Sequence, residues 1–238
     1  MTISTRYESI TAHDGGTFEA WCAVPERGSG PGILLFQEIF GVNDNMRGLA
    51  ERLADEGYVA LVPDMFWRLQ PRFESKDESG MGDGMALAQK FDPQLGGADI
   101  NATHAHLLGM DECTGKIGAT GFCFGGTLTF AAAATSKVDG KGIDAAVSYY
   151  GSGTASMLGM ADQVTCPMMF HYGNNDPFIP DEDVVAVEEA FAGRDDVTVL
   201  RYDAGHAFSN WDAPSLHDPD AADLAWSRTL EFFATHLR

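Results

Sequence analysis

The chain has 238 residues, a length that can bury a complete hydrophobic core, and we expect a single domain spanning residues 1–238. Asp and Glu outnumber Lys and Arg by 35 to 15, and the resulting net charge of −20 argues against nucleic acid or an anionic membrane as a partner. We interpret this acidity as a solvated surface that aids solubility, with adaptation to a saline environment as the alternative.

Cysteine usage and the amino terminus both bear on location. Residues 1–10 lack a basic segment followed by an apolar one, and no run of about 18 apolar residues could span a membrane. The cysteines form no Cys-x-x-Cys pair, which favours reduced thiols over a disulfide framework or a zinc site; they are Cys22, Cys113, Cys123 and Cys166. We therefore expect a cytoplasmic protein.

Short apolar runs alternate with segments of helical periodicity along the chain. Strands are expected at 18–24, 32–36, 58–62, 117–120, 143–150, 166–173 and 197–202, and helices at 44–56, 85–91, 98–110, 127–134, 181–192 and 220–236. A strand, a helix and a further strand form a βαβ crossover, which makes the two strands parallel neighbours. The sequence therefore predicts an α/β fold whose mainly parallel sheet is covered by helices on both faces.

One long segment shows neither the apolar run of a strand nor the periodicity of a helix. Residues 65–84 are rich in Gly, Ser, Pro and charge, and we interpret them as a surface excursion, where a lid or a substrate-binding insertion is expected. Pro93 and the pair Gly96-Gly97 are expected to interrupt the helical pattern that follows.

The turn Gly121-Phe122-Cys123-Phe124-Gly125-Gly126 lies between a predicted strand and a predicted helix. A Gly-x-nucleophile-x-Gly turn at such a junction strains its central residue and exposes that side chain at the head of the helix. A helix N-terminus favours an anion and can lower the pKa of a thiol from its free value of about 8.5. Cys123 is therefore a candidate nucleophile that would act as a thiolate.

Four polar residues fall where predicted strands end, the edge at which α/β sheets bind ligands: Glu38, Cys123, Asp176 and His206. The last three follow the chain order nucleophile, acid, histidine of the α/β-hydrolase triad. His206 could accept and return a proton near neutral pH, and Asp176 would orient the imidazole. The rival bases are His171, His217 and His236.

The same pattern suggests the remaining parts of a hydrolase site. Backbone N–H groups of Phe124, just after the nucleophile, and of Ile39, just after the earlier strand, would hold an oxyanion. This chemistry requires neither a metal nor a cofactor. Aromatic side chains would form an apolar pocket wall, although each could instead belong to the core; they are Phe40, Tyr149, Phe178, Phe208 and Trp211.

Six motifs are spread between about residues 18 and 233: Gln37-Glu38-Ile39-Phe40-Gly41-Val42-Asn43, Pro63-Asp64, Gly121 to Gly126, Tyr149-Tyr150-Gly151, Asp176 with Phe178-Ile179-Pro180, and Gly205-His206-Ala207-Phe208. Together they resemble the dienelactone hydrolase family, the carboxymethylenebutenolidases. The resemblance implies an α/β-hydrolase fold, a triad of Cys123, His206 and Asp176, and hydrolysis of an enol-lactone or a related ester. It also implies that Glu38 lies beside the thiol.

A carboxylate beside Cys123 would oppose the thiolate by like-charge repulsion. In the family, the counterpart of Glu38 is understood to take up the thiol proton or to swing away when substrate binds, so that the resting thiol stays protected. Well-studied members also carry two arginines that contact the substrate carboxylate, but this chain has Asn210 and, by a gapless match, Met81 at those positions. Arg68 and Arg72 are candidate substitutes. The departure favours a less charged lactone or ester.

The leading hypothesis is a cysteine-dependent hydrolase of lactones or small esters that forms a thioester acyl-enzyme. A general carboxylesterase or thioesterase without lactone preference is the alternative among enzymes. A redox-sensing or binding protein that uses Cys123 as an oxidisable thiol is the alternative outside them. The expected partner is the small-molecule lactone or ester, and the oligomeric state stays open, with a monomer as the working assumption.

Overall fold

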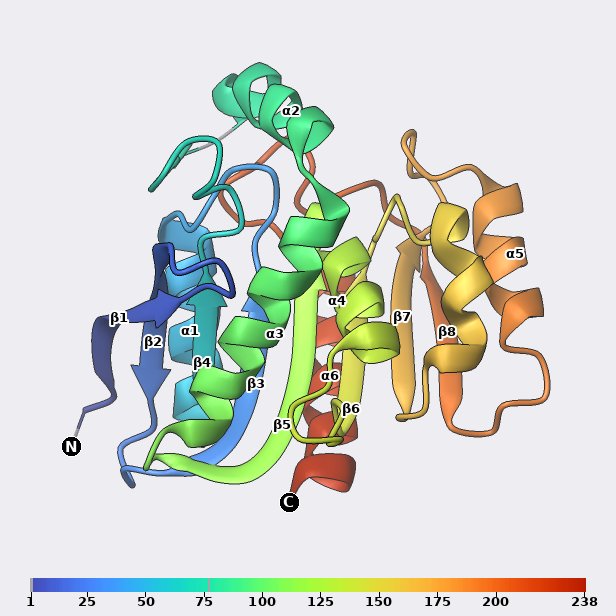
Figure 1. Cartoon of the computed structure of the whole chain (residues 1–238). Coiled ribbons are helices and arrows are strands. Elements are labelled where there is room, and N and C mark those ends of the chain that lie inside the picture. Colours follow the sequence, from blue (N-terminus) through green and yellow to red (C-terminus); the bar gives the residue numbers. More distant parts are fainter. Residues whose placement is uncertain (1, 77) are drawn as a thin grey trace.

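In the computed structural model, which describes residues 2–76 and 78–238, eight strands form one sheet in the order β1-β2-β4-β3-β5-β6-β7-β8 (Figure 1). The strands are β1 Ser4–Thr11, β2 Thr17–Val24, β3 Gly30–Phe36, β4 Val59–Pro63, β5 Cys113–Phe122, β6 Ala145–Tyr149, β7 Met168–Gly173 and β8 Val197–Tyr202. β2 runs antiparallel to β1 and β4, and all other neighbours are parallel. The prediction of a mainly parallel sheet is therefore confirmed.

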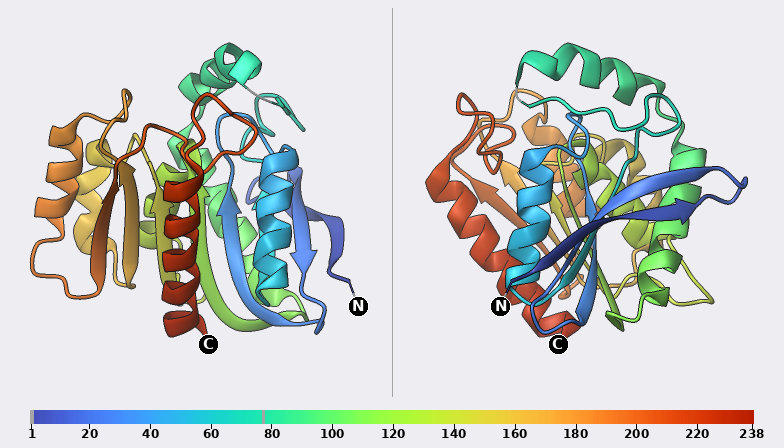
Figure 2. Two further views of the ribbon diagram at one scale, coloured as in Figure 1. Left: turned by 180° about the vertical axis from the view of Figure 1, so that it is seen from behind. Right: turned by 90° about the vertical axis from the view of Figure 1, so that its left-hand side faces the viewer.

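Helices cover both faces of this sheet. They are α1 Asp44–Asp55, α2 Met81–Lys90, α3 Pro93–Gly109, α4 Phe124–Thr135, α5 Asp181–Ala190 and α6 Pro219–Leu237, with the 3₁₀ segments η1 Glu78–Gly80 and η2 Ala155–Gln163. α3 and α4 lie on one face and α1 and α6 on the other (Figures 1 and 2). This two-sided cover explains why β3, β4, β6 and β7 are buried along their whole length. Within the described residues, no helix is both long and apolar enough to cross a membrane.

α2 and α3 begin four and five residues earlier than the sequence pattern predicts. α3 begins at Pro93, because the Asp92 side chain caps it by accepting hydrogen bonds from the N–H groups of Gln94 and Leu95. A proline at the first helical position forfeits no helical hydrogen bond, because the N–H group that it lacks would have no partner there. Pro93 thus starts a helix and does not interrupt one. Gly96 stands inside α3 because a Cβ there would lie 2.1 Å from the Phe91 ring. α2 begins at Met81, within the excursion that we predicted to be irregular.

The excursion is fastened to α3 by a buried carboxylate. Asp99 accepts hydrogen bonds from Trp67 Nε1 and from Arg68 Nε and Nη2, each at 2.8 Å. The Arg68 guanidinium also pairs with Asp14 at 2.6 Å, in the turn between β1 and β2. These bonds fix the path of the chain from β4 towards α2.

A second, smaller core holds α2 above the carboxyl ends of the strands (Figure 1). It consists of Phe66, Phe73 and Leu87, and Phe91 and Phe124 pack against it. The Phe124 ring stacks on Phe66 at 5.3 Å and meets Phe91 edge-on at 4.9 Å between centroids. Because Phe124 is the first residue of α4, this core connects the excursion to the turn that carries Cys123.

Candidate active site

Cys123 sits at the junction of β5 and α4 in a backbone conformation that side-chain-bearing residues rarely adopt. Its φ is 54° and its ψ is −115°, and its side chain is half-buried. The turn needs a neighbour without a side chain, because a Cβ on Gly125 would lie 2.2 Å from the Phe36 carbonyl oxygen. The geometry places the thiol at the head of α4, at the carboxyl edge of the sheet.

His206 and Asp176 come from the loops after β8 and β7 and meet at the same edge. The Nδ1–H group of His206 donates to Asp176 Oδ2 at 2.7 Å, and the Phe178 N–H donates to Asp176 Oδ1 at 2.8 Å. Cys123 is the hydrogen-bond partner on the other side of the imidazole. The structure therefore brings Cys123, His206 and Asp176 into one hydrogen-bonded series.

The charge state of His206 follows from these neighbours. Burial by itself lowers the pKa of His206, but the negative charge of Cys123 and the hydrogen bonds to Asp176 and Cys123 raise it to about 10. The imidazole beside the Cys123 sulfur is then protonated at neutral pH. A protonated imidazole in contact with a thiol can act as a proton donor.

Glu38 lies in the loop after β3, and its side chain is 3% exposed. Its Oε2 accepts from Asn210 Nδ2 at 2.5 Å, and its Oε1 accepts from the Tyr150 hydroxyl at 3.3 Å. Burial raises the pKa of Glu38, against the opposing effects of the His206 charge and of the two hydrogen bonds. Glu38 is thus within the electrostatic reach of the imidazole.

Tyr150 belongs to the site, although our sequence analysis named its neighbour Tyr149. The Tyr150 ring lies 5.1 Å from the His206 ring, and its φ of 37° turns it out of β6 towards Glu38. Tyr149 is buried and bonds Thr229 Oγ1 through its hydroxyl at 2.6 Å. The sequence shows that two tyrosines stand together at a predicted strand end, which indicates that one of them lies at the site. It does not show which one, because that depends on the backbone turn after β6.

The rival bases have other partners. His171 is buried in β7 and contacts the Tyr202 and Thr229 hydroxyl groups, and burial followed by the Arg228 charge lowers its pKa to about 3. His217 bonds the Phe208 carbonyl oxygen through Nδ1 at 2.9 Å. His236, in the last turn of α6, packs against Phe232. None of these contacts involves Cys123.

Comparisons with known proteins agree on one family. The sequence model of the dienelactone hydrolase family matches residues 18–237. A carboxymethylenebutenolidase of Pseudomonas sp. (strain P51) is 36% identical over 225 residues, which cover 94% of this chain and 92% of that protein. The chain belongs to the dienelactone hydrolase family. It is therefore a hydrolase of the α/β-hydrolase fold, as the resemblance of its motifs predicts.

Solved structures agree with this assignment. A protein from Klebsiella pneumoniae subsp. pneumoniae superposes with a TM-score of 0.85 at 28% identity, covering 99% of this chain and 100% of that one. A dienelactone hydrolase-like promiscuous phosphotriesterase from metagenomic libraries superposes with a TM-score of 0.82 at 27% identity, over 99% and 100% of the two chains. Both superpositions extend over 99% of this chain.

The two candidate substitutes for the family arginines are paired with other carboxylates in this chain. Arg68 is committed to Asp99 and Asp14. Arg72 pairs with Glu19 and stacks over the Tyr7 ring, 4.4 Å from its centroid. The position expected to hold an arginine after the His206 loop holds Asn210, whose amide is bonded to Glu38.

The predicted aromatic pocket wall is only partly at the site. Phe178 is 53% exposed, and its ring lies 5.1 Å from that of His206. Phe208 is fully buried against Tyr150, and Phe40 is buried in the loop after β3. Trp211 packs over α1, where the Arg52 guanidinium lies 5.8 Å from its ring. Phe178 is therefore the one of these five aromatic side chains that is largely exposed beside His206.

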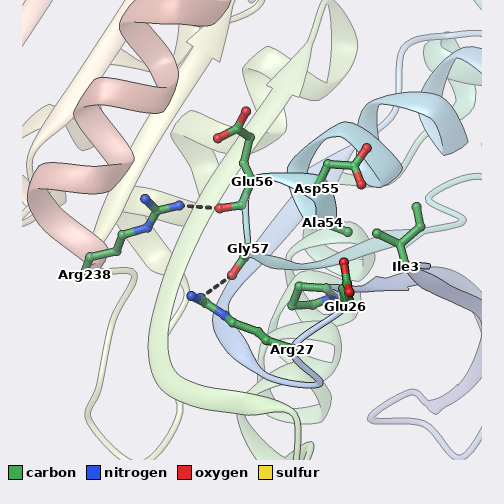
Figure 3. Close-up of a pocket in the computed structure, with 9 residues that line it drawn as sticks. Ile3, Glu26, Arg27, Ala54, Asp55, Glu56, Gly57 and Arg238 are labelled. Carbon is green, nitrogen blue, oxygen red and sulfur yellow. Dashed lines mark hydrogen bonds between the residues drawn. The ribbon is translucent and has the colours of Figure 1, made fainter. Parts of the chain in front are cut away.

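Two hollows of the molecule differ in character. One, of about 580 Å³, lies near the amino ends of β3 and β4, and its arginines are occupied, because Arg27 donates to the Gly57 carbonyl oxygen and Arg238 to that of Glu56 (Figure 3). The other, of about 370 Å³, is an apolar groove between α3, α4 and η2. Its lining includes Phe91, Ile100, Phe124, Leu128, Ala131, Met157 and Met160.

Proposed function

We propose that this member of the dienelactone hydrolase family acts on uncharged lactones or small esters through Cys123 as a covalent nucleophile. The observation that supports this most directly is the placement of His206 between the Asp176 carboxylate and the Cys123 thiol, at a strained turn. An imidazole fixed in this way has one nitrogen committed to the orienting acid and the other free for proton transfer. A structural histidine would need no such pairing.

In the proposed reaction, the Cys123 thiolate attacks the carbonyl carbon, and the backbone N–H groups of Ile39 and Phe124 hold the resulting oxyanion. The tetrahedral intermediate collapses, and His206 gives its proton to the leaving oxygen, which stays tethered to the acyl group when the substrate is a lactone. His206 then takes a proton from water, which attacks the thioester. Collapse of the second intermediate releases the acid and restores the thiolate.

The charges around the thiol favour an uncharged substrate. Glu38 and Asp176 are carboxyl groups of the site, His206 is its cation, and Asn210 is neutral. A substrate carboxylate would meet repulsion from Glu38 without a dedicated partner. We expect a neutral lactone to be hydrolysed with a kcat/KM at least about tenfold higher than its carboxylate-bearing analogue.

Cys123→Ala tests the nucleophile. We expect turnover to fall to background, and the wild-type protein mixed with an aryl ester to show an added acyl mass on the peptide that contains Cys123. Thermal unfolding of the variant serves as the control for folding. Undiminished turnover in Cys123→Ala would refute the proposal.

A specific observation favours broader esterase activity as the second candidate function. The apolar groove has Phe124 among its lining residues, and this residue directly follows the nucleophile. A groove of this kind suits the hydrocarbon part of an open-chain ester or thioester. Rates for matched lactones and open-chain esters separate the two functions. If Ala131→Trp, which fills the groove, lowers the rate for long-chain esters and leaves that for small lactones, the groove serves the broader activity.

A further inference from the structure

The backbone is strained directly after His206. Ala207 has a φ of 54°, a left-handed conformation that residues with a Cβ rarely adopt. Such a residue keeps this conformation only where the segments on both sides of it are held. The segment before Ala207 is held, because the His206 side chain is bonded to Asp176 at 2.7 Å. Whatever holds the segment after Ala207 therefore also fixes the imidazole.

Phe208 anchors the chain on that second side. The residue is completely buried, and its ring lies 5.2 Å from the rings of both Tyr150 and Tyr202. An aromatic ring in such a setting fixes the place of a residue, because turning it out would expose apolar surface to water. The orientation of the peptide group of Phe208 depends on its hydrogen bonds instead.

Two donors fix this peptide group. The Phe208 carbonyl oxygen accepts from the Asp218 N–H at 3.0 Å and from His217 Nδ1 at 2.9 Å. Asp218 is the N-cap of α6, and its side chain accepts from the Ala221 N–H at 3.0 Å. The first donor is thus part of a helix start, and His217 adds the second donor from the residue before the cap. Together the two bonds tie the loop of His206 to α6.

The bond to Phe208 also determines which nitrogen of His217 carries hydrogen. A carbonyl oxygen only accepts, so Nδ1 must be protonated in the neutral as well as in the charged ring. The bond therefore persists when the ring gains or loses a proton at Nε2. Because Phe208 is completely buried, water cannot take the place of this donor if it is removed.

We propose that His217 is a positioning residue, which holds His206 in register with Asp176 through the Phe208 carbonyl group. It contacts neither the substrate nor the reacting atoms. Without its N–H group the strained backbone at Ala207 relaxes, and the imidazole turns relative to Asp176. The inference rests on the proposed role of His206 in hydrolysis, but the position of the imidazole can be observed without turnover.

The test compares His217→Leu with His217→Asn. The side chain of Asn carries an N–H donor at nearly the position of Nδ1, whereas that of Leu carries none. In His217→Leu we expect kcat for an aryl ester to fall by about tenfold and KM to stay within about twofold, because a displaced base slows proton transfer more than it weakens binding. His217→Asn should keep kcat within about threefold of the wild type. The ring borders a hollow of about 110 Å³, which can accommodate the change of shape.

Two further measurements separate positioning from general damage. His236→Leu removes another half-buried histidine, which packs against Phe232 in the last turn of α6, and it should leave kcat unchanged. The proton NMR resonance of the His206 Nδ1–H group reports its hydrogen bond to Asp176 directly. This resonance should shift or broaden in His217→Leu and keep its wild-type position in His217→Asn.

A wild-type kcat in His217→Leu would overturn the inference, as would an equal loss of kcat in His217→Asn or an unmoved His206 resonance in His217→Leu. If His217→Leu does not fold, NMR of the nitrogen-labelled wild-type protein identifies the tautomer of His217. A neutral ring with its proton on Nδ1 supports the inference, and one with its proton on Nε2 would overturn it. Turnover that persists in Cys123→Ala would refute the proposed function, whereas the NMR results on His206 and His217 would still decide the inference.

Discussion

Cys123 shows how one residue can be held in a costly conformation for the sake of its side chain. A residue with a Cβ in the left-handed region carries strain of about 1–3 kcal/mol, which the packing of the elements around it must offset. β3 and α4 supply part of that packing, because Gly125 brings the first turn of α4 against the Phe36 carbonyl group at the end of β3. The result is a thiol that lies within hydrogen-bonding reach of His206.

Asp176→Asn tests the role assigned to the orienting acid. The amide keeps the size of the carboxyl group, but it no longer stabilises an imidazolium and can favour the wrong tautomer of His206. We expect kcat to fall by about a hundredfold or more, with little change in the unfolding midpoint. The measurement is steady-state hydrolysis of an aryl ester beside thermal unfolding. A kcat within about twofold of wild type would argue against Asp176 as the orienting acid.

At the scale of elements, α2 matters because it presses on the loop after β3. Gly84 of α2 lies so near this loop that a Cβ would stand 2.3 Å from the Ile39 carbonyl oxygen. Ile39 carries one of the two N–H groups that we assign to the oxyanion hole. The excursion therefore supports the loop from above, and Phe124, with the second N–H group, packs against the small core below α2.

Gly84→Ala should disturb the oxyanion hole through α2. The added methyl group must push the helix away from the Ile39 loop, and we expect kcat to fall by about tenfold or more, because a misplaced donor stabilises the oxyanion less. Gly82→Ala is the control in the same helix, since nothing lies within 4 Å of its Cβ position. It should keep full activity and stabilise α2 by up to about 1 kcal/mol. Equal activity of both variants would contradict the assignment of Ile39.

On the scale of the whole molecule, two buried histidines make stability depend on pH. Burial, with the positive charge of Lys141 added, lowers the pKa of His104 to about 4, and burial and Arg228 lower that of His171 to about 3. The pKa of a histidine in an unfolded chain is about 6.5. Between this value and the lowered pKa of the folded state, the unfolded chain therefore binds more protons than the folded protein. The stability that these two histidines contribute is therefore complete above about pH 6.5 and is lost as the pH falls towards 3. His206, whose pKa is raised to about 10, contributes in the opposite direction, because its share is lost as the pH rises towards 10.

His104→Asn should reduce this pH dependence. Each buried histidine contributes a slope of about 1 kcal/mol per pH unit between pH 6 and 5, and removing one should lower the total slope by that amount. The measurement is the free energy of unfolding in urea at several pH values. His13→Asn replaces an exposed histidine and should leave the slope as in the wild type. An unchanged slope in His104→Asn would show that His104 charges freely in the folded protein.

The sequence by itself determined the alternation of strands and helices and the turn around Cys123. Continuous apolar runs could be read as β3 and β4 because a strand covered on both faces has no polar side. The order of Cys123, Asp176 and His206 at strand ends could be read because parallel strands all end at one edge of the sheet. Local periodicity and chain order carry this information, and neither depends on how distant segments meet.

Only the tertiary structure decided which side chains around Cys123 meet. The Glu38 carboxylate contacts Tyr150 and not Tyr149, whose hydroxyl bonds Thr229. Neighbouring residues of a strand point to opposite sides, so a shift of one position along the chain exchanges a core side chain for a site side chain. The tertiary structure bound Arg68 and Arg72 to carboxylates far from the thiol in sequence, and it set the Asn210 amide against Glu38 across 172 positions of the chain. Such pairings are determined by packing and by competition for hydrogen-bond partners. Neither can be predicted from the order of residues along the chain.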